Sequence, residues 1–591
     1  MKTAAIERNF RKIKNQLDQS AEIAKHTKPS VLWEHEASVR KKLKILKKFE
    51  TANLKDYDKV YDDYVNLLNY ISNRMLQNYN TQNNTNFVFQ HIIENNYDSY
   101  IKLGIINVLI VEYIPDIISN RFNKIFPSNP KDEYKAARNL KRKFVLHLGE
   151  TNTGKTYNAI EKLKAADNGI YLSPLRILAL ENYEKLNNQG IKCNLLTGEE
   201  EIIVDGAKHT SCTIEKLDLR KYYDVAVIDE IQMIDDDQRG SAWTKALLGI
   251  KCKEIHVCGA ISSKKLLISI LDDCSDDYEI KEYTRSIPLE MDYNTYSYRS
   301  ATEGDALVTF SRKNVLNLAT YYSGIGIKAS IIYGDLPPEV RKKQYEEFTA
   351  KKTKILITTD AIGMGVNLPI KRIIFMDIKK FDGSEVRYLN SNEVKQIAGR
   401  AGRRGIYDVG YVATFNNVQN FISENIRTRD KDIESAVVGP SDEILKIKEL
   451  SLREKLALWS TKPEKISYYR KMDINEYLII LDYLKNYKLD EKIQWRLLTI
   501  PFDVSNMSML NAFLNYIDEL FVAKKSTLSK PNCTIDNLGQ YEIYYQKINL
   551  YYSFSRAFNL EFNQDFVYAE RINVSEKINN LLRSISLNIK L

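Results

Sequence analysis

Short apolar runs alternate with stretches of helical periodicity through the middle of the chain. One helical stretch covers residues 175–188 and ends just before Gly190. The strand-like runs around it are residues 144–148, 170–172, 225–228 and 255–258. Strands that alternate with helices are typical of a parallel, doubly wound sheet. The pattern therefore predicts an α/β domain over residues 141–292.

The same rhythm restarts after residue 293. Its apolar runs are residues 306–310, 330–333, 355–358, 372–376 and 410–414. Short runs of this kind, bounded by polar and glycine-containing segments, again indicate buried strands. A second α/β domain is therefore predicted over residues 293–439, in tandem with the first.

Helical periodicity dominates both ends of the chain. Residues 1–140 are predicted to form an N-terminal helical region and a linker, which Pro127 and Pro130 mark. Residues 440–591 are predicted to form a C-terminal helical domain. The predicted fold class is accordingly α/β, with two parallel-sheet domains flanked by helical regions.

Two helical stretches have faces that allow more than one interpretation. In residues 36–50, Val39, Leu43 and Leu46 recur at helical spacing, so the lysines among them fall on the opposite face. That face is either solvated or contacts a phosphate backbone. In residues 541–552, an aromatic stripe at helical spacing favours a core position over a base-stacking surface.

Composition narrows the class of protein. At 591 residues the chain is too long for one core, and its 44% hydrophobic and 28% charged residues are typical of a soluble globular protein. The net charge of +9 permits nucleic-acid binding without requiring it. No histidine follows His256, so catalysis in the C-terminal half cannot use one.

The cysteines are predicted to be structural. They are Cys193, Cys212, Cys252, Cys258, Cys274 and Cys533, and none forms a C-x-x-C pair. We interpret them as reduced core residues of an intracellular protein, belonging to neither a zinc site nor a disulfide framework.

No membrane or targeting segment is evident in the sequence. No apolar run approaches the about 18–20 residues that a membrane span needs. The N-terminus lacks the apolar region of a signal peptide, and Glu7, Asp18 and Glu22 argue against an uncleaved transit peptide. We therefore expect a cytoplasmic protein as the chain stands, or a mitochondrial-matrix protein if the chain is a processed form.

The first chemical signal is a glycine-rich turn between a strand and a helix. The turn has the pattern Gly149-x-x-x-x-Gly154-Lys155-Thr156 and includes Thr151, Asn152 and Thr153. Glycines let the backbone approach a polyphosphate, and the free N–H groups at the helix start stabilise its charge. Lys155 would reach the terminal phosphates, and the Thr156 hydroxyl would bind Mg²⁺.

The second signal is a pair of carboxylates at the end of a buried strand. Asp229 and Glu230 follow the run 225–228. Phosphoryl transfer to water needs an acid near Mg²⁺ and a group that orients or deprotonates the water. Asp229 suits the first role and Glu230 the second.

Two further signals lie in the second α/β domain. Gln396-Ile-Ala-Gly-Arg400-Ala-Gly-Arg403 alternates small residues with arginines, so two guanidinium groups can approach a γ-phosphate as arginine fingers do. The run 355–358 is followed by a turn rich in hydroxyls and glycines, which includes Gly363 and Gly365. Such a turn can touch a nucleotide and a sugar-phosphate backbone together.

The order of these motifs resembles that of superfamily 2 helicases of the DExH type. Within each motif, the residues are most similar to those of the ATP-dependent RNA helicase of the mitochondrial degradosome and its bacterial relatives. The matching stretches include residues 149–156, 173–176, 196–200, 229–233, 333–338 and 359–365. The resemblance covers residues 140–415 and implies two RecA-like domains that use ATP and Mg²⁺.

The resemblance also implies roles for individual residues. Residues 149 and 151–156 would hold the triphosphate and Mg²⁺, and Arg400 and Arg403 would complete the site from the second domain. Gln232 and Gln396 would link the nucleotide to the cleft between the domains. The residues implied to grip the backbone of a nucleic-acid strand are Pro174, Arg176, Thr213, Ser311 and Thr359.

Segment 379–392 matches the place where this family carries a strand-separating hairpin. Phe381 and Tyr388 are its candidate wedge aromatics, with surface packing as the alternative. The sequence departs from the family at Glu150, where relatives often have proline, and at Ala260, where an acidic residue is common. The second departure bears on the coupling between hydrolysis and movement.

The resemblance implies an ATP-driven 3′→5′ helicase or translocase of single-stranded nucleic acid, most consistent with RNA unwinding coupled to RNA decay and an exoribonuclease partner. A DNA helicase with the same motor remains an alternative, because no residue pattern reveals a 2′-hydroxyl reader. A nucleotide-switched scaffold that recruits a ribonuclease is a third interpretation. Glu230 and the two arginines argue against it.

Overall fold

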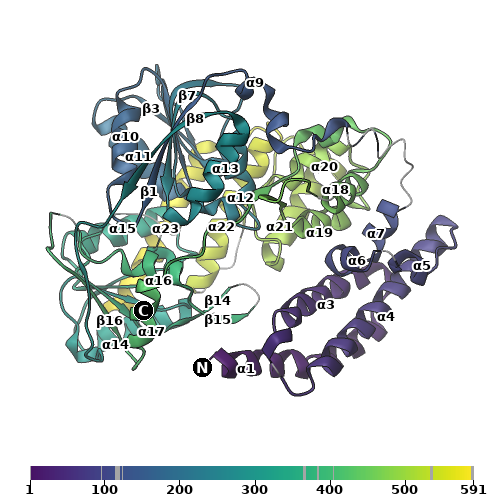
Figure 1. Ribbon diagram of the computed structural model, residues 1–591, viewed down its shortest axis with the longest axis horizontal. Helices are drawn as coiled ribbons and strands as arrows, with labels where there is room; N and C mark the ends of the chain where they lie inside the picture. Colours follow the sequence, from purple (N-terminus) through teal and green to yellow (C-terminus); the bar gives the residue numbers. More distant parts are fainter. Residues whose placement is uncertain are drawn as a thin grey trace.

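The protein is described here from a computed structural model (Figure 1). The structure describes residues 2–52, 54–94, 96–112, 120, 122, 124–363, 368–382, 385–403, 405–462, 464–532 and 537–587. Of the predicted site residues, Gly365 lies outside these ranges, as does Cys533 among the cysteines.

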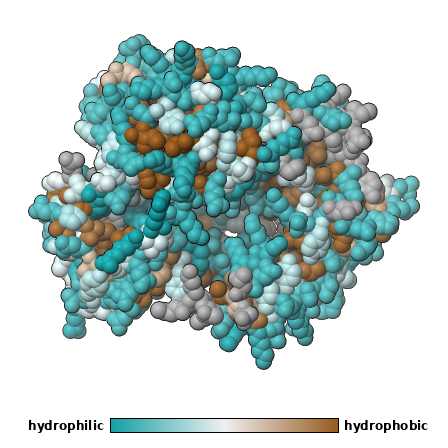
Figure 2. All heavy atoms as spheres, in the orientation of Figure 1, coloured by the Kyte–Doolittle hydropathy of each residue, from teal (hydrophilic) through white to brown (hydrophobic). Residues whose placement is uncertain are grey.

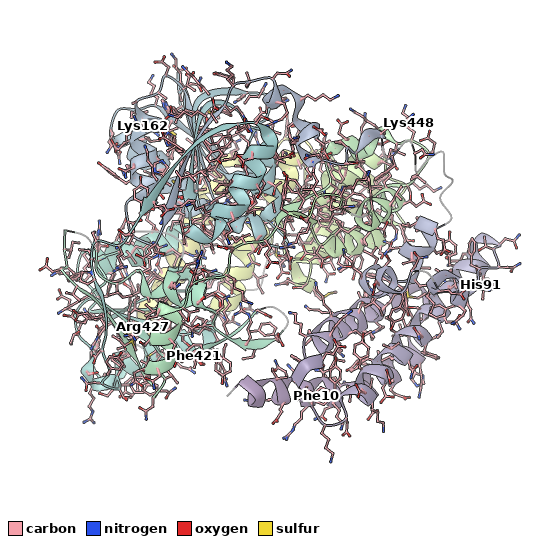
Figure 3. The ribbon with its side chains drawn as sticks, viewed as in Figure 1. Phe10, His91, Lys162, Phe421, Arg427 and Lys448 are labelled. Atoms are coloured by element: carbon pink, nitrogen blue, oxygen red, sulfur yellow. The ribbon has the colours of Figure 1, made fainter. Side chains whose placement is uncertain are left out.

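The N-terminal region is helical, as predicted, and has its own core. Its helices are α1 (Lys2–Asn15), α2 (Leu17–His26), α3 (Leu32–Lys47), α4 (Tyr57–Asn83), α5 (Phe89–Ile93), α6 (Tyr97–Leu103) and α7 (Ile105–Glu112). Phe10, labelled in Figure 3, is buried in this core together with Leu43 and Leu46 of α3. Lys41, Lys44, Lys47 and Lys48 are exposed on the opposite side, as the periodicity predicts.

The first α/β domain is built on a mostly parallel sheet. Its strands are β1 (Lys143–Gly149), β2 (Gly169–Ser173), β3 (Cys193–Leu196), β4 (Glu201–Ile202), β5 (His209–Thr213), β6 (Tyr222–Ile228), β7 (Lys251–Gly259) and β8 (Asp277–Tyr283). The order is β4-β3-β5-β2-β6-β7-β1-β8, and only the β3–β4 pair is antiparallel. Helices on both faces bury β1 and β2 almost completely, which explains their continuous apolar runs.

Two helical layers cover this sheet. They consist of α10 (Lys155–Lys164), α11 (Arg176–Asn188), α12 (Gly240–Gly249) and α13 (Lys264–Cys274). Residues of α10 and α11 form one buried cluster, and residues of α12 and α13 form a larger one on the other face. The ends of β1, β2, β5 and β6 are thereby fixed along one edge of the sheet.

The second α/β domain has a fully parallel sheet. Its order is β11-β12-β10-β13-β16-β9. The strands are β9 (Leu289–Met291), β10 (Asp305–Val308), β11 (Ala329–Ile332), β12 (Ile355–Thr358), β13 (Arg372–Phe375) and β16 (Gly410–Thr414). Two tandem α/β domains built on parallel sheets are thus confirmed. Because β9 pairs with β16, the strand belongs to the second domain, although the predicted boundary at residue 292 placed it in the first.

Helices α14 (Arg312–Gly324), α15 (Pro338–Thr349), α16 (Ser391–Ala398) and α17 (Gln419–Arg427) accompany the second sheet. A capping box starts α16, in which Asn390 accepts from the Glu393 amide and Glu393 accepts from the Asn390 amide. This cap fixes where α16 begins, and so where the loop after its last turn emerges toward the first domain.

A β-hairpin projects from the second domain, where segment 379–392 was predicted to carry one. It pairs β14 (Lys379–Phe381) with β15 (Val386–Tyr388). Phe381 is 59% exposed, whereas Tyr388 packs on Phe421 of α17 with ring centres 5.8 Å apart. Phe421 is labelled in Figure 3. The Asn9 side chain of α1 lies 3.4 Å from the Val386 carbonyl oxygen, so the N-terminal region reaches the hairpin.

The C-terminal region is dominated by helices, as predicted. After the short parallel pair β17 (Ala436–Val438) and β18 (Tyr469–Lys471) come its main helices. They are α18 (Leu452–Thr461), α19 (Asn475–Leu484), α20 (Glu491–Leu498), α21 (Met507–Ile517), α22 (Leu538–Ala557) and α23 (Gln564–Leu587). These helices share one buried cluster with α14 and β11, so the second domain and the C-terminal region form a continuous core.

The aromatic stripe of α22 belongs to this core. Tyr545, Ile548 and Tyr552 are buried, which favours the packing interpretation over base stacking. The surface seen in Figure 2 is largely hydrophilic, with apolar residues in scattered patches. Within the described ranges, no helix is both long and apolar enough to span a bilayer.

Among the cysteines within the described ranges, all five are free thiols, and Cys193, Cys212, Cys252 and Cys258 are buried. Burial raises the pKa of the Cys193 thiol to about 12, so it is protonated at neutral pH. The predicted core position is therefore confirmed for these four cysteines, whereas Cys274 is only partly buried.

A buried ion pair fixes the start of the first domain. Arg142 precedes β1, is 2% exposed and donates from Nε to Asp276 Oδ1 at 3.0 Å. Its Nη1 also donates to the Leu247 carbonyl at 3.1 Å. The pair therefore joins the strand that leads into the phosphate loop to α12 and to the start of β8.

We predict that Asp276→Ala strongly destabilises this domain. The substitution leaves the buried Arg142 guanidinium without its carboxylate, which costs about 3–5 kcal/mol. The midpoint of urea-induced unfolding, followed by circular dichroism, should fall. Asp218→Ala is the matched control, because Asp218 pairs with the exposed Arg220. Equal midpoints for both variants would contradict the prediction.

Candidate functional site

The glycine-rich turn lies where the sequence predicts it, between β1 and α10. A Cβ atom on Gly149 would lie 2.0 Å from the Tyr283 carbonyl oxygen, so no larger residue fits there. Gly154 has φ +84°, and a Cβ atom built there meets nothing within 4 Å. The turn therefore leaves open space above its backbone, at the N-terminus of α10, where an anion is stabilised.

Lys155 is directed back over this turn. Its Nζ donates to the Gly149 carbonyl at 2.9 Å and also contacts the Glu150 carbonyl. Burial lowers the pKa of the Lys155 ammonium, and the nearby carboxylates of Glu230 and Asp229 oppose that shift. A cation that the protein holds at the mouth of the turn is suited to pair with a terminal phosphate.

Asp229 is the most constrained carboxylate of the site. Its Oδ1 accepts from the Thr156 hydroxyl at 3.0 Å, and its Oδ2 accepts from the Tyr171 hydroxyl at 2.8 Å. Burial, together with the charge of Glu230, raises the pKa of Asp229 to about 6. A divalent cation beside Asp229 would relieve both effects.

The donor set fits Mg²⁺. Magnesium prefers oxygen ligands and commonly takes one or two carboxylates together with substrate phosphates and water. Thr156 and Asp229 place a hydroxyl and a carboxylate side by side next to the phosphate turn. Within the described ranges no group of three or more histidine, cysteine or acidic residues is placed so that it could hold a metal ion by itself.

Glu230 stands at a sharp turn just after the strand. It has φ +51°, in the left-handed region, so its side chain leaves the direction of β6. The side chain of Gln232 bonds on both sides. Its Nε2 donates to the Glu230 carboxylate, and its Oε1 accepts from the Ala260 amide at 3.0 Å. Gln232 thus connects the second motif to the segment that follows β7.

The second domain presents its motif across the cleft. Gln396 lies in the last turn of α16, and Arg400 follows in the loop after it. Arg400 Nη2 donates to the Gly363 carbonyl at 2.5 Å. Burial lowers the pKa of Arg400, while the charges of Glu230 and Asp229 in the opposite domain act in the other sense. The arginine therefore lies within electrostatic reach of the acidic pair.

The two loops touch at the phosphate turn. Asn152 Nδ2 donates to the Gly402 carbonyl at 3.2 Å. A Cβ atom on Gly399 would lie 2.9 Å from Thr151 Cβ, so glycine is needed for this approach. Arg403 follows directly after Gly402 and is half-buried. The structure thus brings the arginine loop of the second domain onto the phosphate turn, next to the acidic pair.

Four of the five predicted strand-gripping residues lie at, or just past, the ends of neighbouring strands. Ser173 pairs with Thr213 in register, and Pro174 follows directly. In the second sheet Val308 pairs with Thr358, so Ser311 and Thr359 also emerge near one another. The carboxyl edge of parallel strands is where such sheets bind ligands.

Arg176 has a different environment, which the sequence did not reveal. Its Nη2 donates to two carboxylates, Glu200 at 3.1 Å and Glu339 at 3.0 Å. Its Nη1 donates to the Glu199 carboxylate at 2.6 Å and to the Tyr545 hydroxyl at 3.0 Å. Tyr545 also donates to Glu339, at 2.7 Å. In this arrangement Arg176 joins both α/β domains to α22 through carboxylates.

Tyr171 and Tyr545 are the polar partners that the sequence analysis missed. Each occupies an apolar position, Tyr171 in a buried strand and Tyr545 in the aromatic stripe of α22. The only available signal was the residue type, because a buried tyrosine usually finds a hydrogen-bond partner for its hydroxyl. That signal does not identify the partner.

Comparison with known families agrees with this geometry. The DEXQ-box helicase domain of Suv3 matches residues 130–283, and the helicase conserved C-terminal domain matches residues 290–405. The first match covers the phosphate turn and the acidic pair. The second covers the arginine loop.

The curated proteins to which the chain is similar are named mitochondrial ATP-dependent RNA helicases. The mitochondrial ATP-dependent RNA helicase SUV3 of Candida albicans is 38% identical over 65% of this chain and 54% of its own length. The mitochondrial ATP-dependent RNA helicase SUPV3L1 of Homo sapiens is 38% identical over 53% of this chain and 42% of its own. The SUV3 of Saccharomyces cerevisiae is 39% identical over 54% and 45%, respectively.

This chain thus spans about half the length of these relatives. Both helicase domains and their order are nevertheless matched, and the residues that face each other across the cleft belong to these domains. The chain therefore carries a Suv3-type DEXQ-box helicase domain followed by a helicase conserved C-terminal domain.

Proposed function

We propose that this protein is an ATP-dependent 3′→5′ helicase or translocase that acts on single-stranded nucleic acid, with RNA as its preferred substrate. One observation carries the proposal. The phosphate turn of the first domain, which carries Lys155, contacts the arginine loop of the second: Asn152 Nδ2 donates to the Gly402 carbonyl at 3.2 Å. A site divided between two domains ties hydrolysis to the relative position of those domains.

Each residue has a distinct task in this proposal. Lys155 and the turn amides bind the triphosphate, and Thr156 and Asp229 hold Mg²⁺, which supplies charge neutralisation at the phosphates when it is bound. Glu230 orients the attacking water and accepts its proton. Arg400 and Arg403 stabilise the charge that develops on the γ-phosphate.

Movement along the nucleic-acid strand follows because the residues that grip it are divided between the two α/β domains. Pro174 and Thr213 belong to the first domain, whereas Ser311 and Thr359 belong to the second. If nucleotide binding closes the cleft and hydrolysis opens it, the two sets of residues approach and separate along the strand. Repeated cycles then advance the protein. The 3′→5′ polarity is supported only by the resemblance to superfamily 2 helicases of the DExH type.

The relatives support the further assignments. Their names give an RNA helicase activity and a mitochondrial location, from which we propose RNA as the substrate and the mitochondrial matrix as the compartment. We also propose an exoribonuclease as partner, because unwinding would supply the single strands that such an enzyme degrades. A DNA helicase with the same motor is the alternative that the residues do not separate from this proposal.

The test of the function is ATP turnover without nucleic acid, with single-stranded RNA, and with single-stranded DNA of equal length at fixed salt. We expect stimulation by RNA and less by DNA. Lys155→Ala should abolish turnover because it removes the phosphate-binding cation, whereas Lys162→Ala, on the exposed face of α10 (Figure 3), should not. Turnover by Lys155→Ala near the wild-type rate would contradict the assignment of the nucleotide site. Greater stimulation by DNA than by RNA would indicate that DNA is the substrate.

Arg403→Ala should retain nucleotide binding and lose most of its turnover. The reason is that an arginine finger acts on the charge of the transition state, where its removal costs about 10³-fold or more in kcat. Stopped-flow binding of a fluorescent ATP analogue and steady-state kcat measure the two effects separately. A normal kcat would mean that Arg403 does not complete the site.

Phe381→Ala should impair duplex unwinding and spare RNA-stimulated ATPase activity. Phe381 is an exposed aromatic at the end of β14, where it can stack on a base pair at the junction. A strand-displacement assay with a fluorescent duplex measures unwinding. Val386→Ala, at the position paired with Phe381, is the control for hairpin stability. Unwinding at the wild-type rate by Phe381→Ala would contradict the hypothesis that Phe381 separates the strands.

A further inference from the structure

The segment between the two α/β domains contains an arginine that no motif accounts for. Arg285 lies between the end of β8 at Tyr283 and the start of β9 at Leu289. Its guanidinium reaches out of this linker into the arginine loop of the second domain. Nη1 donates to the Gly399 carbonyl at 2.7 Å, and Nη2 donates to the Ala401 carbonyl.

These two carbonyls flank Arg400 on both sides. A guanidinium group presents its N–H donors in a rigid planar fork, so two simultaneous bonds fix the acceptors relative to each other. The third donor, Nε, is bound to the Ile287 carbonyl at 2.6 Å within the linker. Arg285 therefore holds the main chain before and after Arg400 against a short, fixed piece of the linker.

The linker itself is tied to the phosphate turn. The Arg285 amide donates to the Glu150 carboxylate at 2.9 Å, and the Glu150 amide lies 3.4 Å from the Tyr283 carbonyl oxygen. Glu150 is the residue that departs from the family pattern in the turn. Its carboxylate faces the linker, while its carbonyl contacts Lys155.

A continuous chain of contacts thus runs from one half of the site to the other. It starts at the phosphate turn, passes through Glu150 to the backbone of Arg285, and continues through the guanidinium to the main chain around Arg400. Burial lowers the pKa of Arg285 and the charge of Glu150 opposes that shift, so the guanidinium stays charged at neutral pH.

We propose that Arg285 is a positioning residue for ATP hydrolysis: it sets the orientation of Arg400 and ties it to the phosphate turn through Glu150. The proposal rests on the function proposed above, because it assigns a role within the same nucleotide site. Arg285 acts through Arg400 and has no contact with the reacting phosphate of its own.

The first part of the experiment compares kcat, KM and nucleotide affinity for Arg285→Ala and Arg285→Lys in the full chain with single-stranded RNA. A misplacement of about 1 Å at a reacting group costs about 100-fold in rate, so we expect kcat to fall about 10- to 100-fold in Arg285→Ala. Affinity for a fluorescent ATP analogue should change less than about 3-fold. Lysine keeps the charge but loses the fork, so Arg285→Lys should recover only part of kcat.

The second part is a double-mutant cycle with Arg400→Ala. If Arg285 acts only through Arg400, Arg285→Ala should lower kcat little further once Arg400 is gone. A merely structural role would give multiplicative losses. Arg299→Ala, an exposed arginine in the same stretch of chain, is the control and should keep the wild-type kcat.

The outcomes separate the two proposals. Wild-type turnover that falls strongly but stays measurable in Arg400→Ala supports the nucleotide site. A normal kcat in Arg285→Ala would then overturn only the positioning role. Multiplicative losses in the cycle would also overturn it. Absence of wild-type turnover would overturn the proposed function and the positioning role together. Loss of kcat with retained affinity and a non-multiplicative cycle supports the inference.

Discussion

The burial of Asp229 is the constraint on which the rest of the nucleotide site depends. A carboxylate at the end of a buried strand is costly unless it is paired or hydrogen-bonded. Here the Thr156 hydroxyl, the Tyr171 hydroxyl and the Glu230 amide all donate to it. These bonds fix the first turn of α10 against β2 and β6, and thereby set the distance between the phosphate turn and the acidic pair.

The second domain meets this arrangement through backbone as well as side chains. Gly399 allows the arginine loop to approach Thr151 more closely than a larger residue would, and the Gly402 carbonyl accepts from the Asn152 side chain. Small residues between arginines therefore serve contact across the cleft and not flexibility alone.

The C-terminal region is bonded to both α/β domains. Helix α22 places Glu542 against Tyr333 and 3.1 Å from Arg312 of the second domain, while Ser553 donates to the Gly198 carbonyl of the first at 2.9 Å. Tyr545 lies between these ends and is bonded to Arg176 and Glu339. A helix bonded to both domains opposes their separation, so any opening of the cleft must strain or break contacts along α22.

The sequence alone determined the tandem α/β architecture, the phosphate turn and the acidic pair, because each depends on short-range patterns of burial and residue type. It did not reveal β5 or β8: β5 buries small polar residues, and β8 is a polar edge strand, so neither forms an apolar run. Nor did it reveal the partners of Arg176 or Arg285. Those bonds join residues up to 369 positions apart, and only the tertiary structure decides which distant carboxylates, hydroxyls and carbonyls a charged side chain meets.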